Sequence, residues 1–277
     1  MTLRELKKSF ETAFASAGIE TPEVDALRLI SEMTGISELE MFLHPELRLS
    51  DEQEQLLQAL AQRRRRREPL QYITGKAYFR DLVLEVTPAV LIPRPETELL
   101  VDFILEKVPQ NGRILDIGTG SGAIALSCAF ERHDVSVTAV DISPDALRVA
   151  QKNAVLCKTE KVRFLESNLF SALEGEKFDF VAANLPYVTE EEYSGLAPEV
   201  REHEPVLALT APDEGFYLIE QTARQLAEHL LPGGRAGFEL SPPQAMRLKL
   251  LLQSLGFSAD IVCDLTGRER FVFAELS

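Results

Sequence analysis

The fold is decided by Ile114-Leu115-Asp116-Ile117-Gly118-Thr119-Gly120-Ser121-Gly122-Ala123-Ile124-Ala125-Leu126. This order is typical of a buried strand, a glycine-rich turn and an apolar helix, the setting in which such a turn cradles a ligand. Glycines at 118, 120 and 122 let the backbone turn sharply and approach a bound molecule with no Cβ in the way. Asp141, twenty-one residues after Gly120, ends the next predicted strand, where a carboxylate can accept both hydroxyl hydrogens of a ribose. The sequence therefore predicts a site for a ribose-containing ligand.

The glycine loop alone leaves two questions open. Gly118, Gly120 and Ala123 also satisfy the loose dinucleotide fingerprint, so a nicotinamide oxidoreductase is an alternative hypothesis. Asp116 has two interpretations, a contact to the amino group of the cofactor or a hydrogen bond that braces the loop.

Short β-rich segments alternate with helical ones from residue 113 onward, which is the pattern of a doubly wound, mostly parallel α/β sheet. The last two segments are separated by only four residues, Thr266 to Glu269. A linker of that length permits antiparallel pairing and excludes a crossover helix, so the last strand must run against the others. The seven predicted strands are 113–117, 136–141, 162–166, 178–183, 235–240, 258–265 and 270–275.

The part of the chain before this sheet divides into two segments. In residues 1–68 apolar side chains recur at intervals of three and four, which predicts a bundle of about four helices that we expect to recognise the substrate. Residues 69–95 form a linker with a β-hairpin around the turn Arg80-Asp81. Pro93 and Pro95 forbid a helix until about residue 96. The predicted catalytic domain is residues 96–277.

Composition narrows the class of function. Apolar residues make up 45% of the chain, but no apolar run approaches the roughly 20 residues of a membrane span. The amino terminus has no continuous apolar stretch of the secretory kind, so we expect a cytoplasmic protein without membrane contact. A formal charge of -15 repels a phosphate backbone and disfavours duplex DNA as a substrate. Three widely spaced cysteines are expected to be reduced packing residues rather than metal ligands, namely Cys128, Cys157 and Cys263.

Positive charge is concentrated in Arg63 to Arg67. One interpretation is the solvated carboxyl-terminal end of a helix, where the dipole favours cations. The other is a weak contact to ribosomal RNA or to an acidic partner.

The fourth predicted strand ends in Asn184-Leu185-Pro186-Tyr187. In an open α/β sheet, ligands lie beyond the carboxyl ends of the strands, so these residues should face the cofactor. A planar amide or amino nitrogen is a poor nucleophile whose two hydrogens must be held. Asn184 Oδ1 and the carbonyl of Leu185 can each accept one hydrogen, and the Tyr187 ring can pack over the flat substrate group. This arrangement predicts methyl transfer from a sulfonium to nitrogen.

Several motifs in this order resemble the release factor glutamine N5-methyltransferases, the PrmC/HemK family. They are residues 69–75 (Pro-Leu-Gln-Tyr-Ile-Thr-Gly), the loop 91–98, the glycine loop, the tetrapeptide 184–187 and residues 204–209. The helical amino terminus matches only in kind. The resemblance implies a class I methyltransferase-like fold, S-adenosyl-L-methionine as the cofactor with S-adenosyl-L-homocysteine as its product, no metal, and the glutamine of a Gly-Gly-Gln loop in peptide chain release factors as the substrate.

The resemblance also assigns residues. The cofactor would contact Gly118, Thr119, Gly120, Ser121, Gly122, Asp141, Ile142, Asn168, Leu169 and Asn184. The glutamine would be received by Asn184, Leu185, Pro186 and Tyr187. Apart from the resemblance, Arg94 and Glu204 could line the substrate channel, with a solvated or loop-bracing role as the alternative.

Two departures from the family pattern matter. Leu185 replaces the first proline of Asn-Pro-Pro-Tyr, so the locked φ is lost while the carbonyl remains. Asn168 stands where the family often has Asp, and an amide accepts a hydrogen bond more weakly than a carboxylate. Two further alternatives stay open. Methyltransferases for amino groups of adenine or guanine share the tetrapeptide, and Leu185 allows a catalytically silent interaction protein.

Overall fold

The computed structural model describes residues 1–276, and the chain divides into two units. The first comprises Met1–Lys76 with Ala197–His203, and the second comprises Ala77–Leu196 with the chain from Glu204 onward. These units differ from the predicted division at residues 68 and 95. Ile73 belongs to the helical core, whereas Phe79 and Leu82 of the hairpin pack in a core of the sheet unit.

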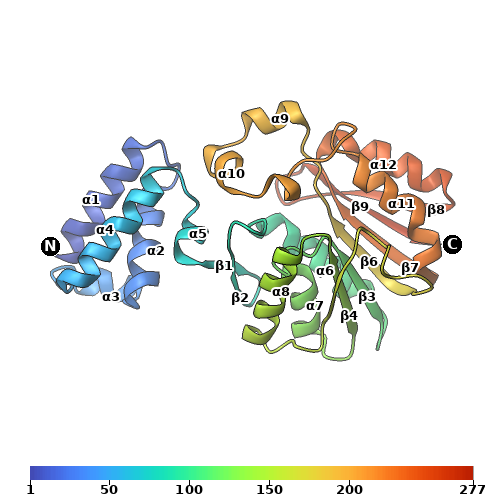
Figure 1. Ribbon diagram of the computed structural model, residues 1–277, viewed down its shortest axis with the longest axis horizontal. Helices are drawn as coiled ribbons and strands as arrows, with labels where there is room; N and C mark the ends of the chain where they lie inside the picture. Colours follow the sequence, from blue (N-terminus) through green and yellow to red (C-terminus); the bar gives the residue numbers. More distant parts are fainter. Residues whose placement is uncertain (277) are drawn as a thin grey trace. The chain divides into compact units, whose positions relative to one another are not determined.

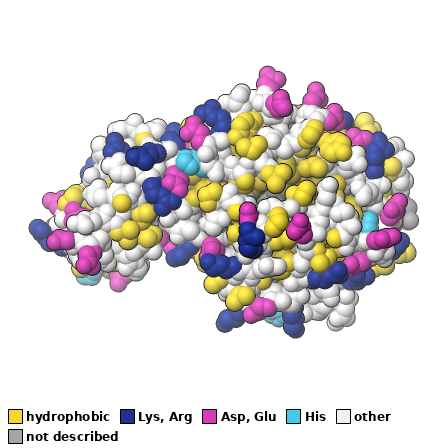
Figure 2. Space-filling model, viewed as in Figure 1, with side chains coloured by type: hydrophobic (Ala, Val, Ile, Leu, Met, Phe, Trp, Pro, Cys, Tyr) yellow, Lys and Arg dark blue, Asp and Glu magenta, His cyan; other side chains and the backbone are white. Residues whose placement is uncertain are grey.

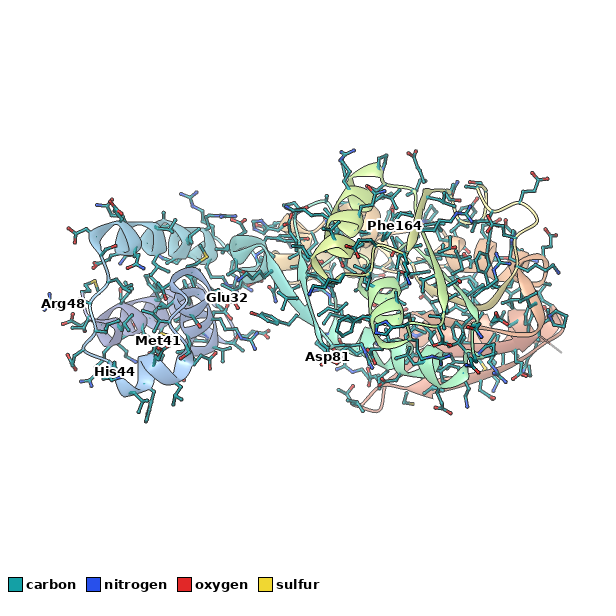
Figure 3. The ribbon with its side chains drawn as sticks, turned by 90° about the horizontal axis from the view of Figure 1, so that it is seen from below. Glu32, Met41, His44, Arg48, Asp81 and Phe164 are labelled. Atoms are coloured by element: carbon teal, nitrogen blue, oxygen red, sulfur yellow. The ribbon has the colours of Figure 1, made fainter. Side chains whose placement is uncertain are left out.

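The first unit is a small helical bundle. Capping boxes at Thr2, Ser37 and Ser50 begin three of its helices, because each side chain accepts from the backbone three residues later. Gly35 ends the second helix with a φ of +74°. Met41 packs into the bundle core with Phe10 and Phe14 and others (Figure 3). The helices are α1 (Leu3–Ser16), α2 (Pro22–Thr34), α3 (Glu38–Leu43), α4 (Asp51–Arg65), α5 (Leu70–Thr74) and α10 (Pro198–His203).

The consecutive arginines end α4, as predicted, but they are not uniformly solvated. Arg64 is buried, and its guanidinium donates to Asp25 (2.7 Å) and to Glu199 (3.0 Å). The Arg67 guanidinium donates two hydrogen bonds to the carboxylate of the same Glu199, each of 2.6 Å. The interpretation as a solvated helix end is therefore wrong for Arg64. The RNA contact stays a prediction, which would rest mainly on the two exposed members, Arg65 and Arg66.

Basic and acidic side chains are interspersed over the face of the molecule seen in Figure 2. No helix within residues 1–276 combines the length and the apolar character needed to cross a bilayer. The three thiols are free. Cys128 and Cys157 are buried as predicted, whereas Cys263, at the end of a strand near the edge of the sheet, is exposed, so its assignment as a packing residue was wrong.

The second unit is built on a seven-stranded sheet of order β5-β4-β3-β6-β7-β9-β8 (Figure 1). Only β9 runs against its neighbours, which confirms the predicted mostly parallel sheet with a reversed last strand. A separate hairpin, β1 with β2, turns at Asp81 (Figure 3). The strands are β1 (Lys76–Phe79), β2 (Leu82–Glu85), β3 (Arg113–Ile117), β4 (Ser136–Asp141), β5 (Arg163–Glu166), β6 (Phe178–Asn184), β7 (Leu230–Glu239), β8 (Phe257–Cys263) and β9 (Glu269–Leu276).

Helices cover both faces of this sheet because successive strand side chains point to opposite faces. Leu115 faces a core with α11 (Tyr217–His229) and α12 (Pro242–Ser254). Ile114 faces a second core with α6 (Glu98–Lys107) and α7 (Ala123–Glu131). The remaining elements are α8 (Pro144–Leu156), α9 (Glu190–Gly195), η1 (Pro95–Thr97) and η2 (Val206–Ala208).

Candidate active site

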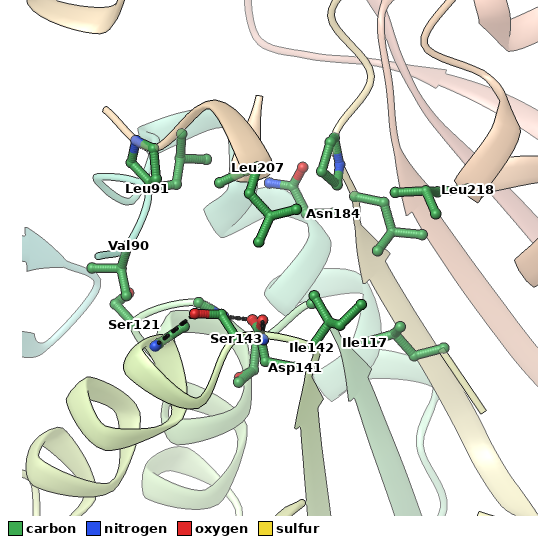
Figure 4. Close-up of a pocket in the computed structure, with 18 of the residues that line it drawn as sticks. Val90, Leu91, Ile117, Ser121, Asp141, Ile142, Ser143, Asn184, Leu207 and Leu218 are labelled. Carbon is green, nitrogen blue, oxygen red and sulfur yellow. Dashed lines mark hydrogen bonds between the residues drawn. The ribbon is translucent and has the colours of Figure 1, made fainter. Parts of the chain in front are cut away.

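A cavity of ≈ 560 Å³ lies in the second unit at the carboxyl ends of β3, β4 and β6 (Figure 4). The register of the sheet aligns these ends, since Ile117 pairs with both Val140 and Ala183. Loops 88–94 and 205–212 contribute further lining residues. The cavity thus lies where ligands bind in open α/β sheets.

The glycine loop leaves β3 and borders the cavity. The amides of Gly118 and Thr119 both donate to the carbonyl of Val140, at 2.9 and 3.0 Å, which pins the turn to β4. Gly120 has a φ of +56°, and a Cβ at this position would point into open space. Gly118 to Ser121 line the cavity, whereas Gly122 does not and instead caps α7 with a φ of +86°. The loop therefore offers a wall free of side-chain obstruction at Gly120.

Asp141 joins the end of β4 to this loop. Its Oδ2 accepts from Gly120 N and its Oδ1 from Ser143 N, both at 2.9 Å. Burial raises the pKa of the carboxyl, opposed by these backbone donors. Each carboxylate oxygen keeps a second lone pair that can accept from a ligand hydroxyl. Ile142, which is 51% exposed, lines the cavity next to Asp141.

Asn168 and Leu169 follow β5 and line the same cavity. Leu169 has a φ of +52°, a strained conformation for a leucine. The hydroxyl of Ser167 accounts for it in part, because it donates to the carbonyl of Leu169 (2.7 Å) and accepts from Ala172 N (3.1 Å). The two hydrogen bonds of the Ser167 hydroxyl therefore fix the conformation of the turn that carries Asn168.

Asp116 takes the loop-bracing role of its two interpretations. It is 1% exposed and does not line the cavity. Its Oδ2 accepts from Thr119 Oγ1 (2.6 Å) and from Ala125 N (3.3 Å), so it ties the turn to the start of α7. Burial raises the pKa of the Asp116 carboxyl to about 7.

The tetrapeptide splits into two parts. Asn184, Leu185 and Pro186 line the cavity, and Figure 4 shows Asn184 at its border. Tyr187 does not line it. Its carbonyl accepts from Gln244 Nε2 (3.0 Å), its hydroxyl lies 3.5 Å from Arg270 Nη1, and burial raises its pKa to about 12. Tyr187 thus lies outside the cavity lining, and the packing of its ring over a substrate stays a prediction.

Arg94 and Glu204 are partners. Arg94 Nη2 donates to Glu204 Oε1 at 2.7 Å, and Ile92 N donates to Oε2 at 3.3 Å. Glu204 is 4% exposed, and burial raises its pKa against the opposing charge of Arg94. Arg94 lines the cavity and Glu204 does not. Glu204 thus braces the loop that carries Arg94.

Thr97 and Glu239 are among the residues near Asn184 that the sequence interpretation did not assign to the site. Thr97 is buried, lines the cavity and accepts a hydrogen bond from Asn184 Nδ2 at 3.2 Å. Its own hydroxyl donates to Glu239 Oε2 at 2.6 Å. The sequence signal for Glu239 is weak, a charged residue that ends a strand after the uncharged residues Ala236, Gly237 and Phe238.

Solved structures define the class of the fold. A methyltransferase from Pyrococcus furiosus superposes with a TM-score of 0.54 at 18% identity, covering 70% of this chain and 88% of that chain. A 16S rRNA N2 G1207 methyltransferase from T. thermophilus, in complex with AdoMet and guanosine, gives a TM-score of 0.53 at 20% identity, covering 73% and 50%. The fold is that of a class I methyltransferase, as predicted.

Sequence relatives place the chain more narrowly. The PrmC N-terminal domain model matches residues 5–75, and the methyltransferase small domain model matches residues 95–200. The release factor glutamine methyltransferase of Deinococcus radiodurans is 36% identical over 99% of this chain and 98% of its own length. That of Salmonella typhimurium is 40% identical over 91% of both. The chain belongs to the family of release factor glutamine methyltransferases, which decides against a nicotinamide oxidoreductase.

Proposed function

We propose that this protein transfers a methyl group from S-adenosyl-L-methionine to the side-chain amide nitrogen of the glutamine in the Gly-Gly-Gln loop of peptide chain release factors. One observation carries the proposal. Asn184 borders the cavity with its amide nitrogen held by Thr97, which leaves Oδ1 to accept from a substrate amide. The proposed substrate is a translation factor, so we place the reaction in the cytoplasm.

The residues around the cavity fit this cofactor. Gly120 presents no side chain toward the ligand, and the Asp141 carboxylate keeps free lone pairs for ribose hydroxyls. Ile142 and Leu169 offer apolar contacts to a flat ring, and the Asn168 amide can accept from an amino group. When bound, S-adenosyl-L-methionine supplies an electrophilic methyl group on a sulfonium. Within residues 1–276, no group of three or more His, Cys, Asp or Glu side chains could hold a metal ion.

The chain itself orients the substrate amide. Asn184 Oδ1 and the backbone carbonyl of Leu185 are the two acceptors for its two hydrogens, and they favour the positive charge that grows on nitrogen. Holding the nitrogen in this way makes positioning the main source of acceleration. Arg94, fixed by Glu204, lines the same cavity and is proposed to contact the substrate chain.

The direct test is methylation with isotopically labelled cofactor. A release factor is compared with its variant in which the glutamine of the loop is Ala, and RNA and DNA are included as competing acceptors. We expect label only in the unaltered release factor. Label in nucleic acid, or equal label in both release factors, would overturn the proposed substrate.

A second prediction concerns Asn184. Asn184→Ala removes one acceptor from the substrate amide, so kcat should fall by about 5- to 150-fold, which corresponds to about 1–3 kcal/mol. Single-turnover kinetics measure the rate, and calorimetric titration of the cofactor is the control for a general loss of binding. A rate equal to that of the unaltered protein would exclude the role given to Asn184.

A further inference from the structure

A buried hydroxyl connects the tetrapeptide to a carboxyl at the end of the neighbouring strand. Asn184 and Glu239 are register partners at the carboxyl ends of β6 and β7. Thr97, the last residue of η1, lies between their side chains, with 3.2 Å from Asn184 Nδ2 to Oγ1 and 2.6 Å from Oγ1 to Glu239 Oε2. Thr97 and Glu239 are 4% and 2% exposed, so water does not compete freely for these bonds. The three groups form a single chain of hydrogen bonds.

The numbers of donors and acceptors fix which group donates to which along this chain of hydrogen bonds. An ionised carboxylate only accepts hydrogen bonds, so the Thr97 hydroxyl must give its one hydrogen to Glu239. The Thr97 oxygen can then only accept, and of the two ends of the Asn184 amide only the NH2 group can donate to it. The amide oxygen is consequently the end left for a ligand.

This direction matters because the two ends of an asparagine amide are nearly identical in shape. Sterics alone do not choose between Oδ1 and Nδ2, and the hydrogen-bond partners decide. If the Asn184 amide were rotated by half a turn, its Nδ2 would face the hydrogens of the substrate nitrogen, and two donors would oppose each other. An acceptor would be lost at the reacting atom.

We propose that Thr97 and Glu239 are positioning residues that hold the Asn184 amide with its oxygen toward the substrate nitrogen. This inference rests on the proposed function and deepens it. Neither residue needs to touch the reacting atoms. Their effect is transmitted through the amide of Asn184.

The direction of these hydrogen bonds holds only while Glu239 is ionised, and the surrounding charged groups influence its pKa. Burial raises its pKa to about 7, while the Thr97 hydroxyl, Arg270 on β9 and Arg94 favour the charged form and Glu96 opposes it. Tyr187, after β6, also faces this carboxyl. A protonated Glu239 can donate to Thr97, which frees the Thr97 hydrogen for Asn184 Oδ1 and allows the amide to turn. The methylation rate should therefore fall as the pH drops through about 7.

The first experiment compares Thr97→Val with Thr97→Ser in methylation of a release factor by the full-length protein. Valine has the shape of threonine without the hydroxyl, so we expect kcat to fall by about 5- to 150-fold, the effect of one misplaced acceptor. The affinity for S-adenosyl-L-methionine should stay nearly unchanged. Serine keeps the hydroxyl and should recover most of the rate. A valine variant as fast as the unaltered protein would overturn the inference, as would equal losses of rate in both variants.

The second experiment uses Glu239→Gln and remains informative if Thr97→Val does not fold. A neutral amide can accept from Thr97 or donate to it, so the direction is no longer fixed by charge. We expect a reduced rate that lacks the fall below pH 7. Asp116, whose pKa is also raised to about 7, stays intact in this variant and controls for other titrations. Retention of the full pH dependence in Glu239→Gln would overturn the inference.

The two levels of the proposal fail in different ways. If the unaltered protein does not methylate a release factor, the proposed function is wrong and the positioning role falls with it. If the unaltered protein is active and both variants match it at every pH, the function stands and the positioning role alone is wrong.

Discussion

Gly120→Ala isolates the role of the glycine loop, because the chain contains a matched control. Gly120 has a φ of +56° and Gly175 a φ of +73°, and a Cβ added at either position meets no protein atom within 4 Å. Both alanines therefore carry the same kind of left-handed strain, about 1–2 kcal/mol of folding free energy. Only Gly120 borders the cavity. A difference between the two variants in ligand affinity thus reports on the cavity wall.

The size of that difference follows from the added methyl group. At Gly120 it would occupy space that we assign to the cofactor, and an extra methyl in a packed site typically loses about 1–3 kcal/mol. The Kd for S-adenosyl-L-methionine, measured by calorimetric titration, should rise about 5- to 150-fold in Gly120→Ala and stay unchanged in Gly175→Ala. Thermal unfolding should shift alike in both. Equal Kd values in the two variants would refute the placement of the cofactor against this loop.

Two further predictions concern stability. In Gly215→Ala the Cβ would lie 2.0 Å from the carbonyl oxygen of Tyr187, so the backbone at Gly215 or at the end of the tetrapeptide must move. Chemical denaturation should show a loss of about 3 kcal/mol in the free energy of unfolding, well beyond that of Gly175→Ala, and an equal loss in both variants would contradict the contact. Burial opposes the charge of Glu199, but hydrogen bonds from Arg67 and Arg64 prevail and lower its pKa below 4.5. The ionised Glu199 therefore stabilises the folded protein fully above pH 4.5, and this stabilisation is lost as the pH falls through the folded-state pKa. Glu199→Gln should lose about 1–3 kcal/mol at pH 7 and part of the acid sensitivity, and an unchanged pH profile of unfolding would disprove this ion pair's contribution.

The parts of the site that the sequence predicted are those encoded locally. The glycine loop follows a strand directly, and Asp141 and Asn184 end theirs, so the strand pattern alone places them at one edge of a parallel sheet. Glu239 also ends a strand, but its relation to Asn184 depends on the register of β6 with β7. Thr97 comes from a short 3-10 turn directly before α6. The spacing of apolar residues predicts neither the register of β6 with β7 nor the direction of that turn.

Contacts between residues far apart in the sequence account for the remaining differences between the predicted and the observed structure. Segment 197–203 belongs to the helical unit because Glu199 pairs with Arg64 and Arg67, which lie more than 130 residues earlier in the chain. An ion pair at that separation leaves no periodic signal in the sequence. Tyr187 likewise has partners in distant segments, Gln244 at its backbone carbonyl and Arg270 at its hydroxyl, which its place in the tetrapeptide does not predict. Sequence motifs identified which residues gather here, and tertiary contacts decide where their side chains point.

Leu185 shows how packing can replace a covalent constraint. Proline would fix φ at this position, and its absence raises the question of what keeps the loop in place. The Leu185 side chain is 5% exposed and packs in the core that the sheet shares with α11 and α12. A Cβ on Gly118 would lie 3.0 Å from Leu185 Cδ2, so the glycine at 118 gives the leucine room. Because a buried side chain in close contact restricts its own backbone, packing against the glycine loop limits the conformations of Leu185, and the leucine gives no structural reason to expect a silent enzyme.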